Sequence, residues 1–124
     1  MIALKVFIKY NKGVFLYKEE IDMPVVFANA SNFEESIAKG IVILDFYADW
    51  CAPCRMIGPV LEQIAEENSD IHVVKVNVDE NMELANQYAV KGIPALFILK
   101  EGKTVAQRAG FMPKDALVEW ARNA

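Results

Sequence analysis

Apolar residues recur with two different periods along the chain, and these periods predict alternating strands and helices from residue 25 onward. The stretch "IVILDFY" at 41–47 is almost continuously apolar and rich in β-branched and aromatic residues, which is typical of a central strand covered on both faces. Apolar residues between Met56 and Ala65 recur at spacings of three and four, which predicts an amphipathic helix that contains Pro59. The full predicted order is β-α-β-α-β-α-β-β-α, which indicates an α/β fold with a mixed central sheet flanked by helices.

Several boundaries of these elements have local signals. Ser31 followed by Glu34 predicts a capping box at the start of the first helix, and Gly40 is expected to end that helix. The dipeptide "EG" at 101–102 predicts a hairpin between the last two strands. Pro113 is expected to open the last helix, where the missing N–H of proline is tolerated.

The first 22 residues predict a separate β-hairpin. Residues 2–10 alternate apolar and polar positions, "NKG" at 11–13 is a turn signal, and the strand-like "VFLYKEEI" follows. The "DMP" at 22–24 breaks the pattern, so we divide the chain into a hairpin extension, 1–22, and a main domain, 23–124. Because a two-stranded hairpin is marginally stable by itself in water, we expect it to pack on the domain or on a second copy of the chain.

Composition narrows the classes of function. The 124 residues suggest one domain, and acidic residues outnumber basic ones by 17 to 13, which argues against non-specific binding of nucleic acid. No apolar run approaches the roughly 20 residues that a membrane span needs, and Lys5 and Lys9 interrupt the apolar N-terminus. Two cysteines are too few for a structural disulfide framework, so we expect a cytoplasmic protein that does not bind membranes.

Both cysteines lie in "WCAPC", where Cys51 and Cys54 are three positions apart at the predicted start of a helix. The helix dipole favours negative charge at this end, which lowers the pKa of a thiol there. The first cysteine could then attack a disulfide and the second could resolve the mixed disulfide. A closed zinc site generally needs four ligands, and His72 is the one histidine of the chain, so we expect no metal.

Four stretches, "LDFYADWCAPCRMIGP", "VKVNVDEN", "KGIPALFILKEG" and "RAGF", resemble the thioredoxin family in content and order. The resemblance covers roughly residues 25–124. It implies the thioredoxin fold and a reversible dithiol–disulfide cycle without a cofactor. Ala52 stands where the family usually has Gly, Tyr47 replaces a common Trp, and Phe111 is bulkier than the usual residue.

The resemblance also implies roles for further residues. Asp45 lies in an apolar run, where burial would raise its pKa, and it matches the family's carboxylate that assists proton transfer at the resolving cysteine. Lys75 matches the lysine beside that carboxylate, although a solvated strand lysine is an alternative interpretation. Pro94 is expected to be cis and to face the cysteines, and an ordinary strand-starting proline is the alternative interpretation. The implied client-binding surface comprises Trp50, Ala52, Pro53, Val78, Gly92, Ile93, Pro94, Ala109, Gly110 and Phe111.

The leading hypothesis is a protein-disulfide reductase that passes electrons to disulfide-containing client proteins and is itself reduced by a thioredoxin reductase. One alternative is a dedicated redox partner with a narrow client list, selected by the hairpin and Phe111. Another is a non-catalytic binding module of the same fold. The hairpin could also support self-association of the chain.

Overall fold

The computed structural model describes residues 3–9, 15–21 and 25–124, with side chains from residue 25 onward. Strands β1 (Ala3–Lys9) and β2 (Phe15–Ile21) pair antiparallel and form a two-stranded sheet of their own. The predicted turn at 11–13 and the predicted break at 22–24 lie outside the described residues. How the hairpin packs therefore stays a prediction.

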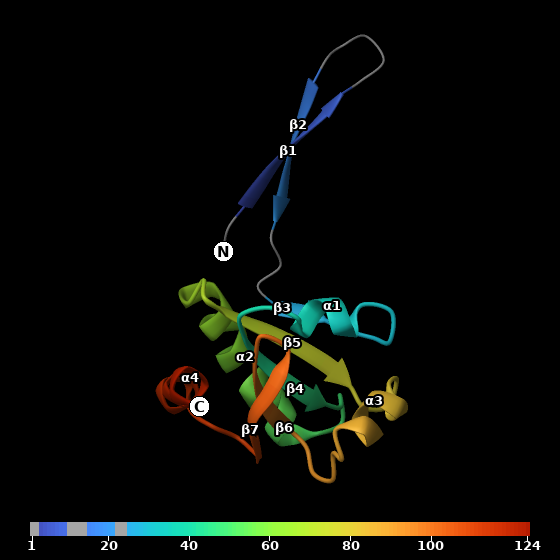
Figure 1. Cartoon of the computed structure of the whole chain (residues 1–124), viewed down its shortest axis with the longest axis vertical. Helices are drawn as coiled ribbons and strands as arrows, with labels where there is room; N and C mark the ends of the chain where they lie inside the picture. Colours follow the sequence, from blue (N-terminus) through green and yellow to red (C-terminus); the bar gives the residue numbers. More distant parts are fainter. Residues whose placement is uncertain (1–2, 10–14, 22–24) are drawn as a thin grey trace.

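The second sheet has five strands in the order β3-β5-β4-β6-β7 (Figure 1). Strands β3 and β4 both run parallel to β5, whereas β6 is antiparallel to β4 and β7 is antiparallel to β6. The predicted mixed sheet is thereby confirmed. The strands are β3 (Val25–Phe27), β4 (Ile41–Tyr47), β5 (Ile71–Asn77), β6 (Ala95–Lys100) and β7 (Lys103–Ala109).

Helices cover both faces of this sheet, because alternate residues of the central strands are apolar on each side. On one face, α2 and α4 pack Leu61 and Leu117 against Ile43 of β4. On the other face, α1 and α3 pack against a core that contains Phe46 and Phe97. The helices are α1 (Phe33–Ile37), α2 (Ala52–Glu67), α3 (Met82–Gln87) and α4 (Lys114–Asn123).

The predicted capping box at Ser31 is wrong. Helix α1 begins at Phe33, and Asn32 occupies the N-cap without a side-chain capping bond. The Oγ of Ser31 instead donates a hydrogen bond of 2.6 Å to Oδ1 of Asn29, and the Ser31 N–H bonds to the same oxygen at 2.9 Å. The Asn29 side chain thus binds Ser31 in a local turn, and the helix starts two residues later.

The other predicted boundaries of helices and strands are close to the observed boundaries. Glu101 and Gly102 have φ angles of 51° and 81°, as a tight two-residue hairpin turn requires. Pro113 is the N-cap of α4. Helix α1 ends at Ile37, so Gly40, with φ of 72°, turns the chain into β4 rather than directly ending the helix.

Candidate active site

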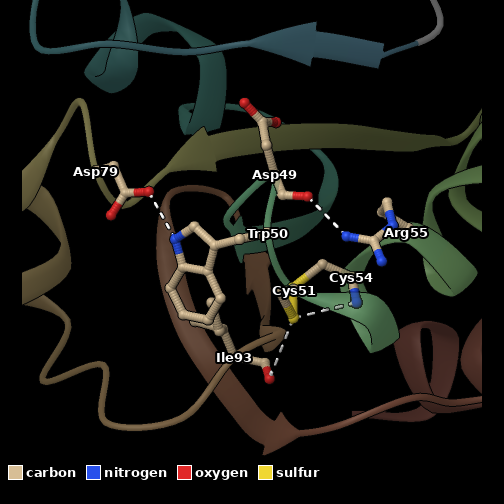
Figure 2. Close-up of a disulfide and its surroundings, with 7 residues drawn as sticks. All are labelled: Asp49, Trp50, Cys51, Cys54, Arg55, Asp79 and Ile93. Atoms are coloured by element: carbon tan, nitrogen blue, oxygen red, sulfur yellow. Dashed lines mark hydrogen bonds between the residues drawn. A yellow bond between two sulfur atoms is a disulfide. The ribbon is translucent and has the colours of Figure 1, made fainter.

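The two cysteines stand at the junction between the central strand β4 and helix α2. Cys51 is the N-cap of α2 and is joined to Cys54 by a disulfide, with a Cα–Cα separation of 5.2 Å. The backbone N–H of Cys54 donates to Sγ of Cys51 across 3.3 Å (Figure 2). In the reduced form the same N–H and the helix dipole would stabilise a Cys51 thiolate. The predicted position of the pair at a helix start is confirmed.

The disulfide is enclosed by neighbouring side chains and by backbone. Cys51 is 6% exposed and Cys54 is 3% exposed, and both pack against Ala48. Sγ of Cys51 lies 3.8 Å from the carbonyl oxygen of Ile93 (Figure 2). The Ile93–Pro94 peptide bond is cis, as the resemblance implied. The backbone before Pro94 therefore borders the sulfur that would react.

Trp50 lies at the surface beside the disulfide and is 68% exposed, so it is not a core residue. Its Nε1 donates to Oδ2 of Asp79 at 2.9 Å (Figure 2). Asp79 is oriented by Asn77, whose Oδ1 accepts the Asp79 N–H at 2.9 Å. Sequence reasoning missed this contact, although "NVDE" directly after a strand is a signal for side-chain-stabilised turns.

Most of the predicted client-binding residues gather at one end of the sheet. The N–H of Gly110 donates to the carbonyl of Pro94 at 2.8 Å, which brings the chain after β7 beside the cis peptide bond. The N–H of Val78 donates to the carbonyl of Tyr47 at 2.9 Å, which brings the chain after β5 to the end of β4. Val78 and Ile93 also pack against the cysteines. Ala52, Pro53, Gly92, Ala109 and Phe111 are exposed, whereas Pro94 is buried.

Asp45 is fully buried in the middle of β4, as predicted. Neither of its carboxyl oxygens has a hydrogen-bond partner in the described part of the chain. Burial raises the pKa of the Asp45 carboxyl from 3.8 to about 7, and the charge of Lys75 opposes part of that rise. A carboxyl with a pKa near neutrality can both accept and donate a proton under ordinary conditions.

Lys75 lies opposite Asp45 in the parallel pairing of β4 and β5. Its side chain is half-buried, and Nζ lies 4.4 Å from the centroid of the Tyr47 ring. The contact with Tyr47 was not predicted, since it joins two strands that are far apart in sequence. This environment differs from that of a freely solvated strand lysine.

Two other features of the described residues concern ligands and membranes. Within residues 25–124, no group of three or more histidine, cysteine and acidic side chains is arranged to hold a metal ion. None of the described helices has the length and apolar character needed to cross a membrane.

The chain is similar to known proteins over the part that contains this site. The family model for thioredoxin matches residues 24–123. The thioredoxin of Bacillus subtilis is 46% identical over 98 residues, which cover 78% of this chain and 94% of that protein. The thioredoxin of Chlamydia trachomatis is 44% identical over 88 residues, which cover 71% of this chain and 86% of that protein. A solved structure of a mutant thioredoxin from Halobacterium salinarum NRC-1 superimposes with a TM-score of 0.75 at 36% identity, covering 79% of this chain and 88% of that one.

Proposed function

The chain belongs to the thioredoxin family, and from that premise we propose how its residues divide the work of a protein-disulfide reductase. The chain is a thiol–disulfide oxidoreductase whose redox-active pair is Cys51 and Cys54. The observation that carries the assignment of roles is the position of this pair, with Cys51 as the N-cap of α2 and an N–H directed at its sulfur.

In the proposed cycle, the Cys51 thiolate attacks one sulfur of a client disulfide. The client S–S bond breaks, one client thiolate leaves, and a mixed disulfide joins Cys51 to the client. The Cys54 thiolate then attacks Sγ of Cys51, which releases the second client thiolate and forms the Cys51–Cys54 disulfide. Two electrons pass from the pair to the client, and each released thiolate takes up a proton.

We assign the proton transfers of the second step to Asp45. Cys54 must lose its proton before it attacks, and a buried carboxylate with a pKa near 7 can accept that proton. The carboxyl has no competing hydrogen bond among the described side chains, which leaves it free for this exchange. Lys75 modulates the process through its charge.

We assign client binding to the surface around the disulfide. The carbonyl of Ile93 borders Sγ of Cys51, so an extended client segment that bonds to this backbone would bring its own sulfur close to Cys51. The exposed rings of Trp50 and Phe111 offer apolar contact to a client. Ala52, Pro53, Val78, Gly92, Pro94, Ala109 and Gly110 complete the proposed surface.

The family implies two kinds of partner, a thioredoxin reductase that returns two electrons to the disulfide and client proteins that receive them. A reductase role is consistent with a reducing compartment, so we place the protein in the cytoplasm. We also propose that the N-terminal hairpin extends a sheet edge of a second copy, because paired β1 and β2 form a sheet too small to be stable alone.

Reduction of insulin disulfides by dithiothreitol tests the division of roles between the cysteines. We expect the parent chain to accelerate precipitation of insulin and Cys51→Ser to remove that acceleration. Cys54→Ser retains the attacking sulfur, so after reduction and removal of dithiothreitol it should accumulate a mixed disulfide with insulin that mass spectrometry detects. Parent activity no faster than that of Cys51→Ser would contradict the assignment.

A further inference from the structure

A row of paired residues crosses the sheet from its edge to Asp45. Phe27 of β3 is opposite Lys75 of β5, Lys75 is opposite Asp45 of β4, and Asp45 is opposite Leu96 of β6. Side chains of directly opposite residues lie on the same face of a sheet. Exposure falls along the row from 57% at Phe27 to 0% at Asp45. The row therefore leads from solvent to the buried carboxyl, and Lys75 occupies the middle.

The ammonium group of Lys75 lies beside two aromatic rings. Nζ lies 4.4 Å from the ring centroid of Tyr47 and 5.6 Å from that of Phe27. The two rings meet edge to face with centroids 6.4 Å apart and planes at 75°. Both separations are within the range at which a cation is attracted to an aromatic face. Helix α2 also lies close to the ammonium group, since a Cβ at Gly58 would lie 3.8 Å from Nζ.

Within the described part of the chain, no ion pair joins Lys75 directly to Asp45. A lysine has a flexible four-carbon stem and a strongly hydrated head, so it would otherwise extend past the sheet edge into water. The rings offer the ammonium group a favourable position instead. Among the described residues, the ammonium thus has two aromatic rings beside it and no salt-bridge partner.

We propose that Phe27 and Tyr47 are positioning residues that hold the Lys75 ammonium beside Asp45 and thereby govern the proton exchange between Asp45 and the cysteine pair. The inference rests on the proposed role of Asp45 in the reductase cycle. Tyr47 also packs against the cluster that contains Cys51 and Cys54, but neither ring needs such a contact for the proposed effect. They act through Lys75.

Lys75 is the charged group that acts on Asp45. From β5, its charge lowers the pKa of Asp45 against the larger effect of burial. From β6, the residue opposite Asp45 is the apolar Leu96, and α2 contributes the uncharged disulfide. On β4 itself, burial is the main cause that raises the pKa of the Tyr47 phenol above 10, so this group is neutral at pH 7. If the rings were removed, the Lys75 ammonium would be free to move away from Asp45 and the pKa of Asp45 would rise further.

The test is a ¹³C NMR titration of the Asp45 carboxyl carbon in the oxidised full-length protein. We expect Phe27→Leu and Tyr47→Leu each to move the midpoint upward by about half a pH unit, the size of one partly exposed cation–aromatic contact. Phe27→Tyr and Tyr47→Phe retain the rings and should keep the parent midpoint. Lys75→Met, which removes the charge itself, should produce the largest upward movement.

A double-mutant cycle separates positioning from general disturbance of the sheet. If the rings act through Lys75, Phe27→Leu has no effect on the midpoint in the Lys75→Met background. Trp120→Leu is the matched control, because its ring lies 5.3 Å from the Arg108 guanidinium at another place in the domain. An unchanged midpoint in both leucine variants, an equal shift in the Lys75→Met background, or an equal shift in Trp120→Leu would overturn the proposal.

The role of Asp45 itself is tested separately, in a single-turnover measurement of mixed-disulfide resolution. We expect Asp45→Asn to slow release of the client by about a hundredfold or more at pH 7, the lower end of what positioned acid–base assistance typically contributes. Release at the parent rate would refute the catalytic role of Asp45. The NMR cycle would still report whether the two rings position Lys75, so the two failures can be told apart.

Discussion

At the scale of single residues, burial gives Asp45 a pKa suited to proton transfer but makes its ionised form unfavourable in the folded protein. The carboxyl is fully buried without a hydrogen-bond partner among the described groups, and burial raises its pKa from 3.8 to about 7. The folded state therefore holds the proton more tightly than the unfolded chain does. The stability associated with Asp45 is fully present below about pH 3.8, declines as pH rises through the range up to about 7, and is absent above that range.

Because the stability contributed by Asp45 declines with rising pH, Asp45→Asn should change the pH dependence of the free energy of unfolding. The amide keeps the shape of the carboxyl but cannot ionise, so the variant should gain stability over the parent as pH rises from 4 to 8. The gain should reach up to about 4 kcal/mol, because each unit of pKa difference corresponds to about 1.36 kcal/mol. Guanidinium titrations at several pH values, with the disulfide intact in both proteins, measure it. A stability difference that is constant with pH would contradict the burial of an ionisable carboxyl.

Some residues of the site could be predicted from the sequence, and others could not. The cysteine pair and Asp45 were identifiable because each breaks a local pattern, the pair by its spacing at a helix start and Asp45 by its charge in an apolar run. Asp79 and the Tyr47–Lys75 contact were missed, because these partners come together through the pairing and end points of separate strands. Such contacts leave no periodic signal in the chain.

At the scale of elements, strand and helix order was predictable because the central strands and α2 have strong periodicities. The start of α1 was not, since the competing hydrogen bonds of Asn29 depend on the conformation of one short turn. Helix α1 has five residues and therefore little intrinsic signal of its own. In such a short helix, local side-chain hydrogen bonds determine where the helix begins.

Two glycines, one in a helix and one in a turn, should change the free energy of unfolding in opposite directions when replaced by alanine. Gly58 lies inside α2, and an added Cβ would meet Nζ of Lys75 at an ordinary contact distance of 3.8 Å. Gly58→Ala should raise the free energy of unfolding by about 0.5–1 kcal/mol, since alanine favours the helix and restricts the unfolded chain. Gly102→Ala should lower it by about 1 kcal/mol, because φ of 81° is unfavourable for a residue with a Cβ.

Chemical denaturation of the two oxidised variants measures both effects under identical conditions. Each variant controls for the other, because the chemical change is the same and only the backbone conformation differs. A loss of stability in Gly58→Ala would contradict the expectation that helix α2 accepts a methyl group beside Nζ of Lys75. No loss in Gly102→Ala would show that the turn between β6 and β7 adapts without strain.

At the scale of the whole molecule, the five-stranded sheet and its helices lie in the part of the chain that matches the family, and β1 and β2 precede that part. The thioredoxin family model matches residues 24–123, and all the proposed site residues lie within that range. The five-stranded sheet is complete without β1 and β2, which pair only with each other. The catalytic chemistry should therefore belong to the domain alone, and the hairpin should affect assembly, stability or partner choice.

Removing residues 1–22 tests this division. We expect a chain that starts at Met23 to fold and to reduce insulin at the parent rate, because the helices and strands of the domain remain. If the hairpin joins two copies, the full-length chain should elute in size-exclusion chromatography at a larger mass that depends on concentration, and the truncated chain at the mass of a monomer. If it packs on its own domain, both chains should be monomers and the full-length chain should melt at a higher temperature. Identical mass states together with equal melting temperatures would contradict both modes of packing.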